Sequence, residues 1–145
     1  MLPRSWSADG RFILCTRNDP KTQTDQWVLR LEGDRQPFLF LQTPFVDNSG
    51  RFSPDGRWIS YHSDDQGRFE VYVQTFPASG GKWQVSTNGG LLADWRNDGK
   101  ELFYISGDQK MMSVEVKPGS NFEAGVPQAL FDLAPLQLVG LRAMT

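Results

Sequence analysis

Short runs of alternating apolar and polar residues, separated by turns that contain glycine, make up most of this sequence. In the middle of the chain Val71 and Val73 share one parity, and so do Trp83 and Val85. This two-residue period is that of a β-strand. The turns are short, so each strand is expected to pair antiparallel with the next. The strands predicted for this unit are 57–62, 69–74, 82–86 and 91–95, with turns at 63–67, 77–81 and 88–90.

The flanking parts of the chain follow the same plan. The predicted strands are 12–16, 26–31 and 37–41 before the middle unit, and 101–105, 112–116 and 127–131 after it. In the first unit we expect residues 18–25 to form the longest loop. We also expect the first repeat turn to lack most of the strand that should precede it. No segment shows convincing helical periodicity, and the apolar tail 134–145 carries no assignment.

One turn phrase occurs three times. Its variants are Trp6-Ser7-Ala8-Asp9-Gly10-Arg11-Phe12, Phe52-Ser53-Pro54-Asp55-Gly56-Arg57-Trp58 and Trp95-Arg96-Asn97-Asp98-Gly99-Lys100-Glu101. The three glycines lie 46 and 43 residues apart, and a period of about 40–50 residues is typical of solenoids, propellers and arrays. Four-stranded antiparallel sheets at this spacing are the blades of a β-propeller.

The sequence therefore predicts an all-β fold, a partial β-propeller of about three four-stranded antiparallel blades that span 1–44, 45–90 and 91–133. Propellers typically have about 4–8 blades, so three blades indicate a fragment of a larger ring. The open blade faces would be apolar, and we expect the isolated chain to self-associate or to be poorly stable. Two copies would together supply a closed ring of six blades.

Composition narrows the class further. The chain has 145 residues, 39% of them apolar and 12% aromatic, which is enough for one packed domain. The net charge of −2 comes without a basic cluster, so a nucleic acid is not expected as a partner. No apolar run approaches the ~18–20 residues that cross a bilayer, so this segment is not expected to insert into a membrane. The single cysteine, Cys15, lies in an apolar run and is interpreted as a buried, inert thiol.

The carboxylates of the repeat phrase are interpreted as structural. An aspartate in a tight turn accepts hydrogen bonds from nearby backbone amides, and the glycine after it tolerates the left-handed conformation. The residues assigned this turn role are Asp9, Gly10, Asp55, Gly56, Asp98 and Gly99.

We predict no catalytic residue, no metal and no cofactor. His62 is the only histidine, and no Gly-x-Ser-x-Gly turn supplies a nucleophile for it. Asp64 and Asp65 are neighbours on a loop, where their side chains diverge rather than converge on a substrate. Asp47, Asn48 and Asp94 flank the predicted innermost strands, and they are the candidates for a polar, ligand-binding rim at one end of the channel.

The repeat resembles that of the TolB-type, WD-repeat-like propellers, which also occur in prolyl oligopeptidase and tricorn-type proteases. The segments 95–104, 111–116 and 125–131 are most similar to the C-terminal propellers of bacterial serine/threonine kinases. That resemblance implies a non-catalytic module that recognises a protein, a peptide or a small ligand, in a larger bacterial protein that is extracytoplasmic or membrane-tethered. The alternatives are a gating propeller of a peptidase and a TolB-like periplasmic scaffold. No kinase signature occurs in this chain.

Overall fold

The computed structural model describes residues 1–136. They form twelve β-strands and one 3₁₀ helix, η1. The strands are β1 (Leu2–Trp6), β2 (Phe12–Asp19), β3 (Gln23–Arg30), β4 (Pro37–Leu41), β5 (Asp47–Phe52), β6 (Trp58–Ser63), β7 (Glu70–Thr75), β8 (Lys82–Gln84), β9 (Leu91–Trp95), β10 (Glu101–Ile105), β11 (Lys110–Glu115) and β12 (Gln128–Asp132). Helix η1 is Ala134–Leu136. The rest of the 134–145 tail lies outside the described residues.

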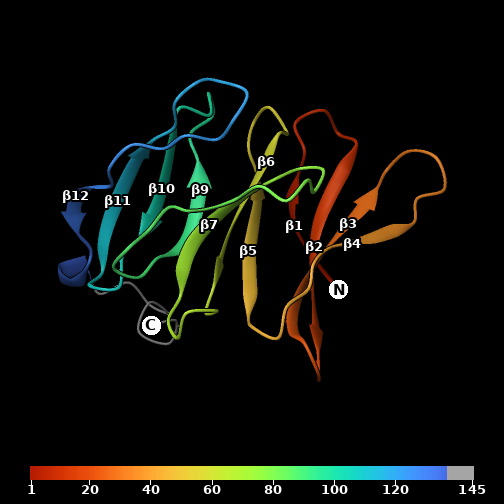
Figure 1. The fold of residues 1–145 in the computed structure, drawn as a ribbon, viewed down its shortest axis with the longest axis horizontal. Helices are drawn as coiled ribbons and strands as arrows, with labels where there is room; N and C mark the ends of the chain where they lie inside the picture. The colour runs from red at the N-terminus through yellow and green to blue at the C-terminus, as the bar shows by residue number, and fades with distance from the viewer. Residues whose placement is uncertain (137–145) are drawn as a thin grey trace.

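Consecutive strands pair into three four-stranded antiparallel sheets, which confirms the predicted fold class. We call them blade 1 (β1–β4), blade 2 (β5–β8) and blade 3 (β9–β12). They stand side by side in chain order, with blade 2 in the middle (Figure 1). The first strands of the three blades, β1, β5 and β9, are edge strands that each pair with one strand only. Among the described residues, no helix is long and apolar enough to cross a membrane.

Two expectations for the first unit are wrong. The repeat turn is preceded by a five-residue strand, β1, which pairs with β2. The expected loop at 18–25 is instead the tip of a long hairpin, in which the pairing of β2 with β3 continues to Asp19 and Gln23. Residues 16–26 are almost all polar, so no alternation of apolar and polar residues indicates these strands. Asp19 holds the tight turn because its Oδ1 accepts hydrogen bonds from the amides of Lys21 and Thr22 at 2.8 and 3.2 Å.

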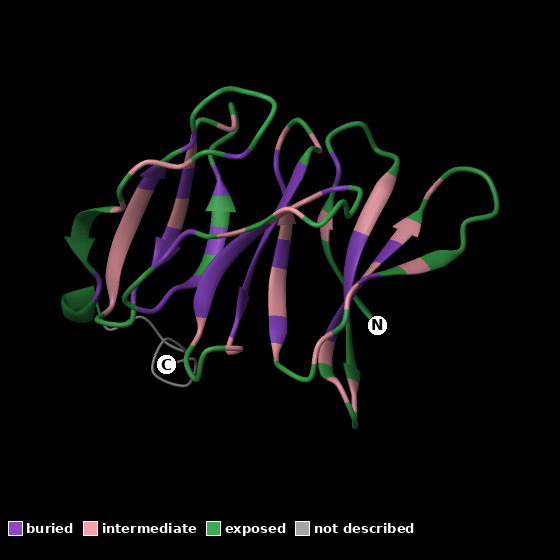
Figure 2. Ribbon diagram, viewed as in Figure 1, coloured by how far each residue is buried: buried purple, intermediate pink, exposed green. Residues whose placement is uncertain are grey.

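The blades pack face to face through two apolar clusters. Between blades 1 and 2 the buried residues are Leu14, Val28, Phe40, Phe52, Ile59 and Phe76. Between blades 2 and 3 they include Trp58, Val71, Val73, Trp95, Leu102, Val114 and Phe122. β6 is buried along its whole length because blade 2 has a neighbour on both faces (Figure 2). Blades 1 and 3 each leave one face open.

Phenylalanines from loops close both clusters. The Phe76 ring lies 5.1 Å from the rings of Phe12 and Phe52, edge to face in both pairs. Phe122, between β11 and β12, has its ring 5.5 Å from those of Trp58 and Trp83. Aromatic pairs at such distances add about 0.5–1.5 kcal/mol each to the energy of burial. The loops that follow β7 and β11 therefore belong to the core.

Candidate functional site

The direction of the strands determines which loops meet at each end of the blades. β5 and β9 point the same way (Figure 1), and each blade is antiparallel. The loop before β9 therefore lies at the same end as the β6–β7 and β10–β11 turns; we call this the loop end. The three repeat turns lie at the opposite end, the repeat-turn end.

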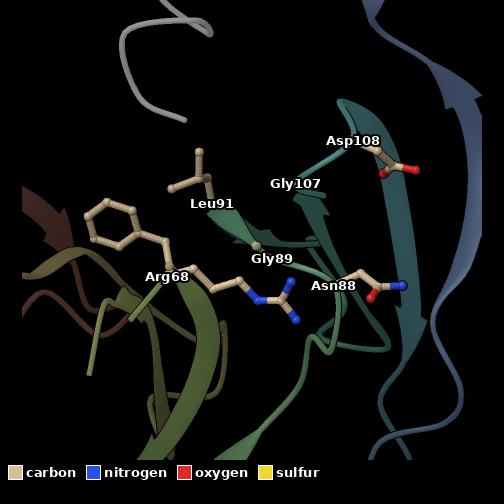
Figure 3. Close-up of a pocket in the computed structure, with 8 residues that line it drawn as sticks. Arg68, Asn88, Gly89, Leu91, Gly107 and Asp108 are labelled. Carbon is tan, nitrogen blue, oxygen red and sulfur yellow. The ribbon is translucent and has the colours of Figure 1, made fainter. Parts of the chain in front are cut away.

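A cleft of about 460 Å³ opens at the loop end, between blades 2 and 3. Three chain segments contribute to it: the residues just before β7, the loop before β9 and the β10–β11 turn. They are Arg68, Phe69, Asn88, Gly89, Gly90, Leu91, Gly107 and Asp108. Figure 3 shows Arg68, Leu91, Asn88 and Asp108 arranged around this space. Phe69 and Leu91 give the cleft an apolar wall, while Asn88 and Asp108 are exposed at its rim.

Glycine allows the two loops beside the cleft to come together. The Gly107 amide donates to the Asn88 carbonyl at 2.9 Å, and the Gly90 amide donates to the Phe69 carbonyl at 2.9 Å. A Cβ atom on Gly107 would lie 2.8 Å from the Asn88 oxygen, which is too close. The cleft is therefore lined partly by backbone that only glycine permits.

Arg68 is exposed on one side and hydrogen-bonded on the other to a network that includes a buried carboxylate. Its Nε donates to Glu70 Oε2 at 2.9 Å, and its guanidinium also reaches the Thr87 carbonyl at 2.5 Å. The Glu70 side chain is only 3% exposed, and its Oε1 accepts from the Ser86 hydroxyl at 2.6 Å. Ser86 in turn accepts from the amide of Val71 at 2.7 Å. The arginine is thus held in one orientation, and its charge is balanced by a buried carboxylate.

At the opposite end, the aspartates of the repeat turns are engaged by their own turns. Asp9 Oδ1 accepts from the Arg11 amide at 3.0 Å, Asp55 Oδ1 from the Arg57 amide at 3.1 Å, and Asp98 Oδ1 from the Lys100 amide at 2.9 Å. The glycines that follow, Gly10, Gly56 and Gly99, have φ values of 73°, 74° and 74°. The Ser7 hydroxyl lowers the pKa of Asp9, and the Arg96 guanidinium lowers the pKa of Asp98 to about 2.

The structure divides the three candidate rim residues among different environments. Asp47 is 1% exposed, accepts from the Thr43 hydroxyl at 2.5 Å, and has its pKa raised by burial. Asn48 lines a separate cleft of about 430 Å³ beside blade 1. Asp94 is on the open face of blade 3, near the far end of β9. They do not form one cluster, and ligand binding by them stays a prediction.

His62 is a buried packing residue. It is 2% exposed, and its ring meets that of Phe69 edge to face at 5.0 Å. Nδ1 accepts a hydrogen bond from the Leu92 amide at 3.1 Å. Burial lowers its pKa to about 4. Within residues 1–136, no group of three or more His, Cys, Asp or Glu side chains could hold a metal ion.

Sequence reasoning missed the residues of the cleft between blades 2 and 3. It identified 88–90 as a turn, but it did not place this turn beside the connection between the predicted strands 101–105 and 112–116. The signal was available, because strand alternation puts the loop before a first strand at the same end as the turn between the second and third strands. Arg68 and Phe69 gave no signal of their own.

Comparison with known proteins gives the fold. No protein-family model matches the sequence, and neither does any curated protein. Among solved structures, a putative TolB from Agrobacterium tumefaciens is 16% identical with a TM-score of 0.67, and the match covers 88% of this chain and 49% of that one. TolB from Acinetobacter baumannii is 20% identical with a TM-score of 0.70, over 90% of this chain and 32% of that one.

A third match is the β-propeller domain of the Trilobed protease from Pyrococcus furiosus, at 16% identity and a TM-score of 0.59. It covers 90% of this chain and 42% of that one. Together these structures show the fold of the chain, which is that of three blades of a β-propeller. The chain spans between about a third and a half of the length of the proteins it matches.

Proposed function

We propose that this chain is a non-catalytic recognition module that binds a peptide segment of a partner protein in the cleft at the loop end. The observation that carries the proposal is the composition of that cleft. The half-buried Phe69 and the buried Leu91 form an apolar wall beside the glycine backbone of two loops and the exposed polar side chains of Asn88 and Asp108. Apolar side chains and backbone amides are the two features that every peptide offers to such a surface.

The chemistry of the lining supports binding rather than catalysis. Among the described residues that line the cleft, Arg68 is the only cation, and Glu70 and the Thr87 carbonyl already engage it. Asp108 accepts a hydrogen bond from the Ser106 hydroxyl, which lowers its pKa and keeps it ionised. Within the part of the chain that the structure describes, no Ser, Cys, Thr or Lys nucleophile lines the cleft beside a base. Fixed, ionised groups at the rim favour selection of a peptide by charge.

We further propose that the module belongs to a larger bacterial protein with a serine/threonine kinase domain. The similarity of segments 95–104, 111–116 and 125–131 to kinase-linked propellers supports this assignment. A peptidase parent and a TolB-like scaffold are the alternatives, since TolB and a protease propeller share the fold. The sequence of the full gene decides among them. A kinase catalytic loop on the same chain supports the proposal, and a Gly-x-Ser-x-Gly hydrolase domain instead overturns it.

Selection from a random peptide library tests the recognition site. Peptides would be selected on the immobilised chain, and their affinity would be compared between wild type, Asn88→Arg and Asp108→Arg. We expect each rim substitution to weaken binding at least tenfold. The matched control is Asn97→Arg, an exposed asparagine in the repeat turn at the opposite end, which should bind as wild type does. A folded chain that enriches no peptide, or binding that ignores both rim substitutions, contradicts the proposal.

A further inference from the structure

We infer that the cleft beside blade 1 binds a small hydrophilic oxyanion, that is, an organic ligand with a carboxylate or a phosphate group. Six polar residues line this cleft of about 430 Å³: Arg4, Thr16, Arg17, Asn18, Thr24 and Asn48. The inference does not depend on peptide binding, because none of these residues lines the cleft between blades 2 and 3. It rests on the charge of the lining and on the direction of its hydrogen bonds.

The cleft lies at the loop end, between blade 1 and the first strand of blade 2. The first repeat turn joins β1 to β2, so the start of β1, the end of β2 and the start of β3 lie at the opposite, loop end. Arg4 comes from β1, Arg17 and Asn18 from the end of β2, and Thr24 from the start of β3. Asn48 is at the start of β5, which lies beside β1 and β2 (Figure 1). Four strands of two blades therefore build this site.

The lining is positively charged, and no carboxylate among the described residues contributes to it. Arg4 and Arg17 are its charged side chains, and neither forms an ion pair within residues 1–136. Asp19 and Asp25 belong to the same hairpin but do not line the cleft, and both accept hydrogen bonds from other groups. Three further clefts of about 400–460 Å³ each combine cations with carboxylates. The charge of this cleft is therefore complementary to that of an anion.

The hydrogen bonds around the cleft occupy acceptors and leave donors free. Arg4 donates through Nε to the Thr16 hydroxyl at 3.1 Å, which leaves both of its Nη groups for a ligand. The Oδ1 atom of Asn48 accepts from the next amide in the chain at 2.8 Å, and that of Asn18 accepts from the Thr24 hydroxyl at 3.3 Å. Neither asparagine NH₂ group has a partner among the described residues. Since these groups can only donate, the ligand that suits them is rich in acceptors.

A buried amide lies directly behind the wall of the cleft. Gln26 is fully buried, and neither its Oε1 nor its Nε2 has a hydrogen-bond partner among the described residues. It pairs with Thr16 across the sheet, and it is two residues from Thr24 on the same face of β3. Buried polar groups normally have a partner, which can be an ordered water or a ligand. The polar character of the cleft thus continues beneath its surface.

Two guanidinium groups beside neutral donors define the class of ligand. The planar fork of an arginine matches the oxygens of a carboxylate or a phosphate group. Asparagine amides and threonine hydroxyls form hydrogen bonds with the hydroxyl groups of a ligand. The volume of about 430 Å³ is within the range of small-molecule sites, which is about 300–1,000 Å³. A monosaccharide with one acidic group combines these features, so glucose 6-phosphate and glucuronate are suitable probes.

Isothermal titration calorimetry with three ligands tests the site. The chain would be titrated with glucose 6-phosphate, with glucuronate and with glucose as the neutral control. We expect saturable binding of at least one of the two anions and none of glucose. Binding of glucose 6-phosphate alone identifies a phosphate site, and binding of glucuronate alone identifies a carboxylate site. Added salt should weaken the binding, because both arginines are exposed. If no ligand binds, or if glucose binds as well as the anions do, the inference is wrong.

Two substitutions and a matched control locate the binding. Asn48→Asp keeps the shape of the side chain and the oxygen that accepts from the next amide, but it adds a negative charge, so affinity for the anion should fall by about tenfold or more. Arg17→Gln, at an exposed position, should have a similar effect. The control, Arg35→Gln, removes the same charge from an exposed arginine between β3 and β4, at the repeat-turn end, and should bind as wild type does. Equal losses for Arg17→Gln and Arg35→Gln, or unchanged binding by Asn48→Asp, would overturn the inference.

Discussion

At the residue scale, His62 shows how a side chain with catalytic chemistry becomes structural. Its Nδ1 accepts the Leu92 amide, and Leu92 has a φ of 55° at a bulge in the pairing of β9 with β10. A non-glycine residue in this conformation costs about 1 kcal/mol or more and needs support from its surroundings. The neutral imidazole provides part of that support. A protonated ring would have no acceptor at Nδ1.

This arrangement predicts a loss of stability in mild acid. The folded-state pKa of His62, about 4, lies below the usual value of 6.5. Between these values the unfolded chain takes up a proton that the folded chain does not, so stability is full above pH 6.5 and falls as the pH drops toward 4. The loss should approach about 3 kcal/mol. Urea unfolding at pH 7 and pH 4.5 measures it.

The control is His62→Asn, whose side-chain oxygen takes the position of Nδ1, can accept from the Leu92 amide and does not titrate. The two proteins share every other titrating group, including Asp47, whose raised pKa acts in the opposite direction. We expect the variant to lose at least 2 kcal/mol less than wild type on acidification, by the same pKa difference. Equal losses for both proteins would contradict the assignment of the effect to His62.

Local chemistry explains which residue roles the sequence could predict. Asp55 and its Arg57 amide are two positions apart, so the turn phrase alone indicated their hydrogen bond. His62 and Leu92 are 30 positions apart, and their contact depends on how blades 2 and 3 pack. Asp47 was expected at an open rim, yet the loop before β5 covers it. The burial of Asp47 depends on tertiary structure, and the pattern of residues along the chain does not predict it.

At the scale of elements, strands were easier to predict than loops. Alternation in β7 and in the segment that contains β8 is a local property, and it fixes which face each residue occupies. The segment between β11 and β12 contains Pro118, Gly119 and Ser120, which are residue types that favour turns. Phe122 within it is 5% exposed and packs among three tryptophans. Because the residues just before Phe122 are of types common in turns, the sequence did not indicate that Phe122 is part of the core.

Replacing Phe122 tests whether this loop belongs to the core. Phe122→Ala would leave a cavity among the rings of Trp58, Trp83 and Trp95, and we expect the free energy of unfolding to fall by about 3–5 kcal/mol. Urea denaturation monitored by tryptophan fluorescence measures it. Phe45→Ala is the control, because Phe45 is 38% exposed and should cost under about 1 kcal/mol. Similar costs at both positions would mean that Phe122 does not close the interface.

At the scale of the whole molecule, the three blades differ in how many of their faces are covered by another blade. β6 is buried along its entire length (Figure 2). By contrast, Trp6 of β1 and Phe131 of β12 are 58% and 50% exposed. The repeat phrase predicted blades but not the state of their outer faces, because that state depends on what stands beside them. Because aromatic surface is exposed at both ends of the row, we expect the stability of this chain to depend on its association.

That link predicts that stability depends on protein concentration. If two copies associate through these faces, folding and association are coupled, and a higher concentration stabilises the folded dimer by mass action. Each tenfold increase in concentration should add about 1.4 kcal/mol per mole of dimer, so the thermal midpoint should rise between low and high micromolar protein. Trp6→Glu should unfold at a lower midpoint that no longer varies with concentration, while Phe45→Glu should follow wild type. Scanning fluorimetry over a hundredfold range measures this, and a wild-type midpoint that stays constant over that range means that three blades fold without a second copy.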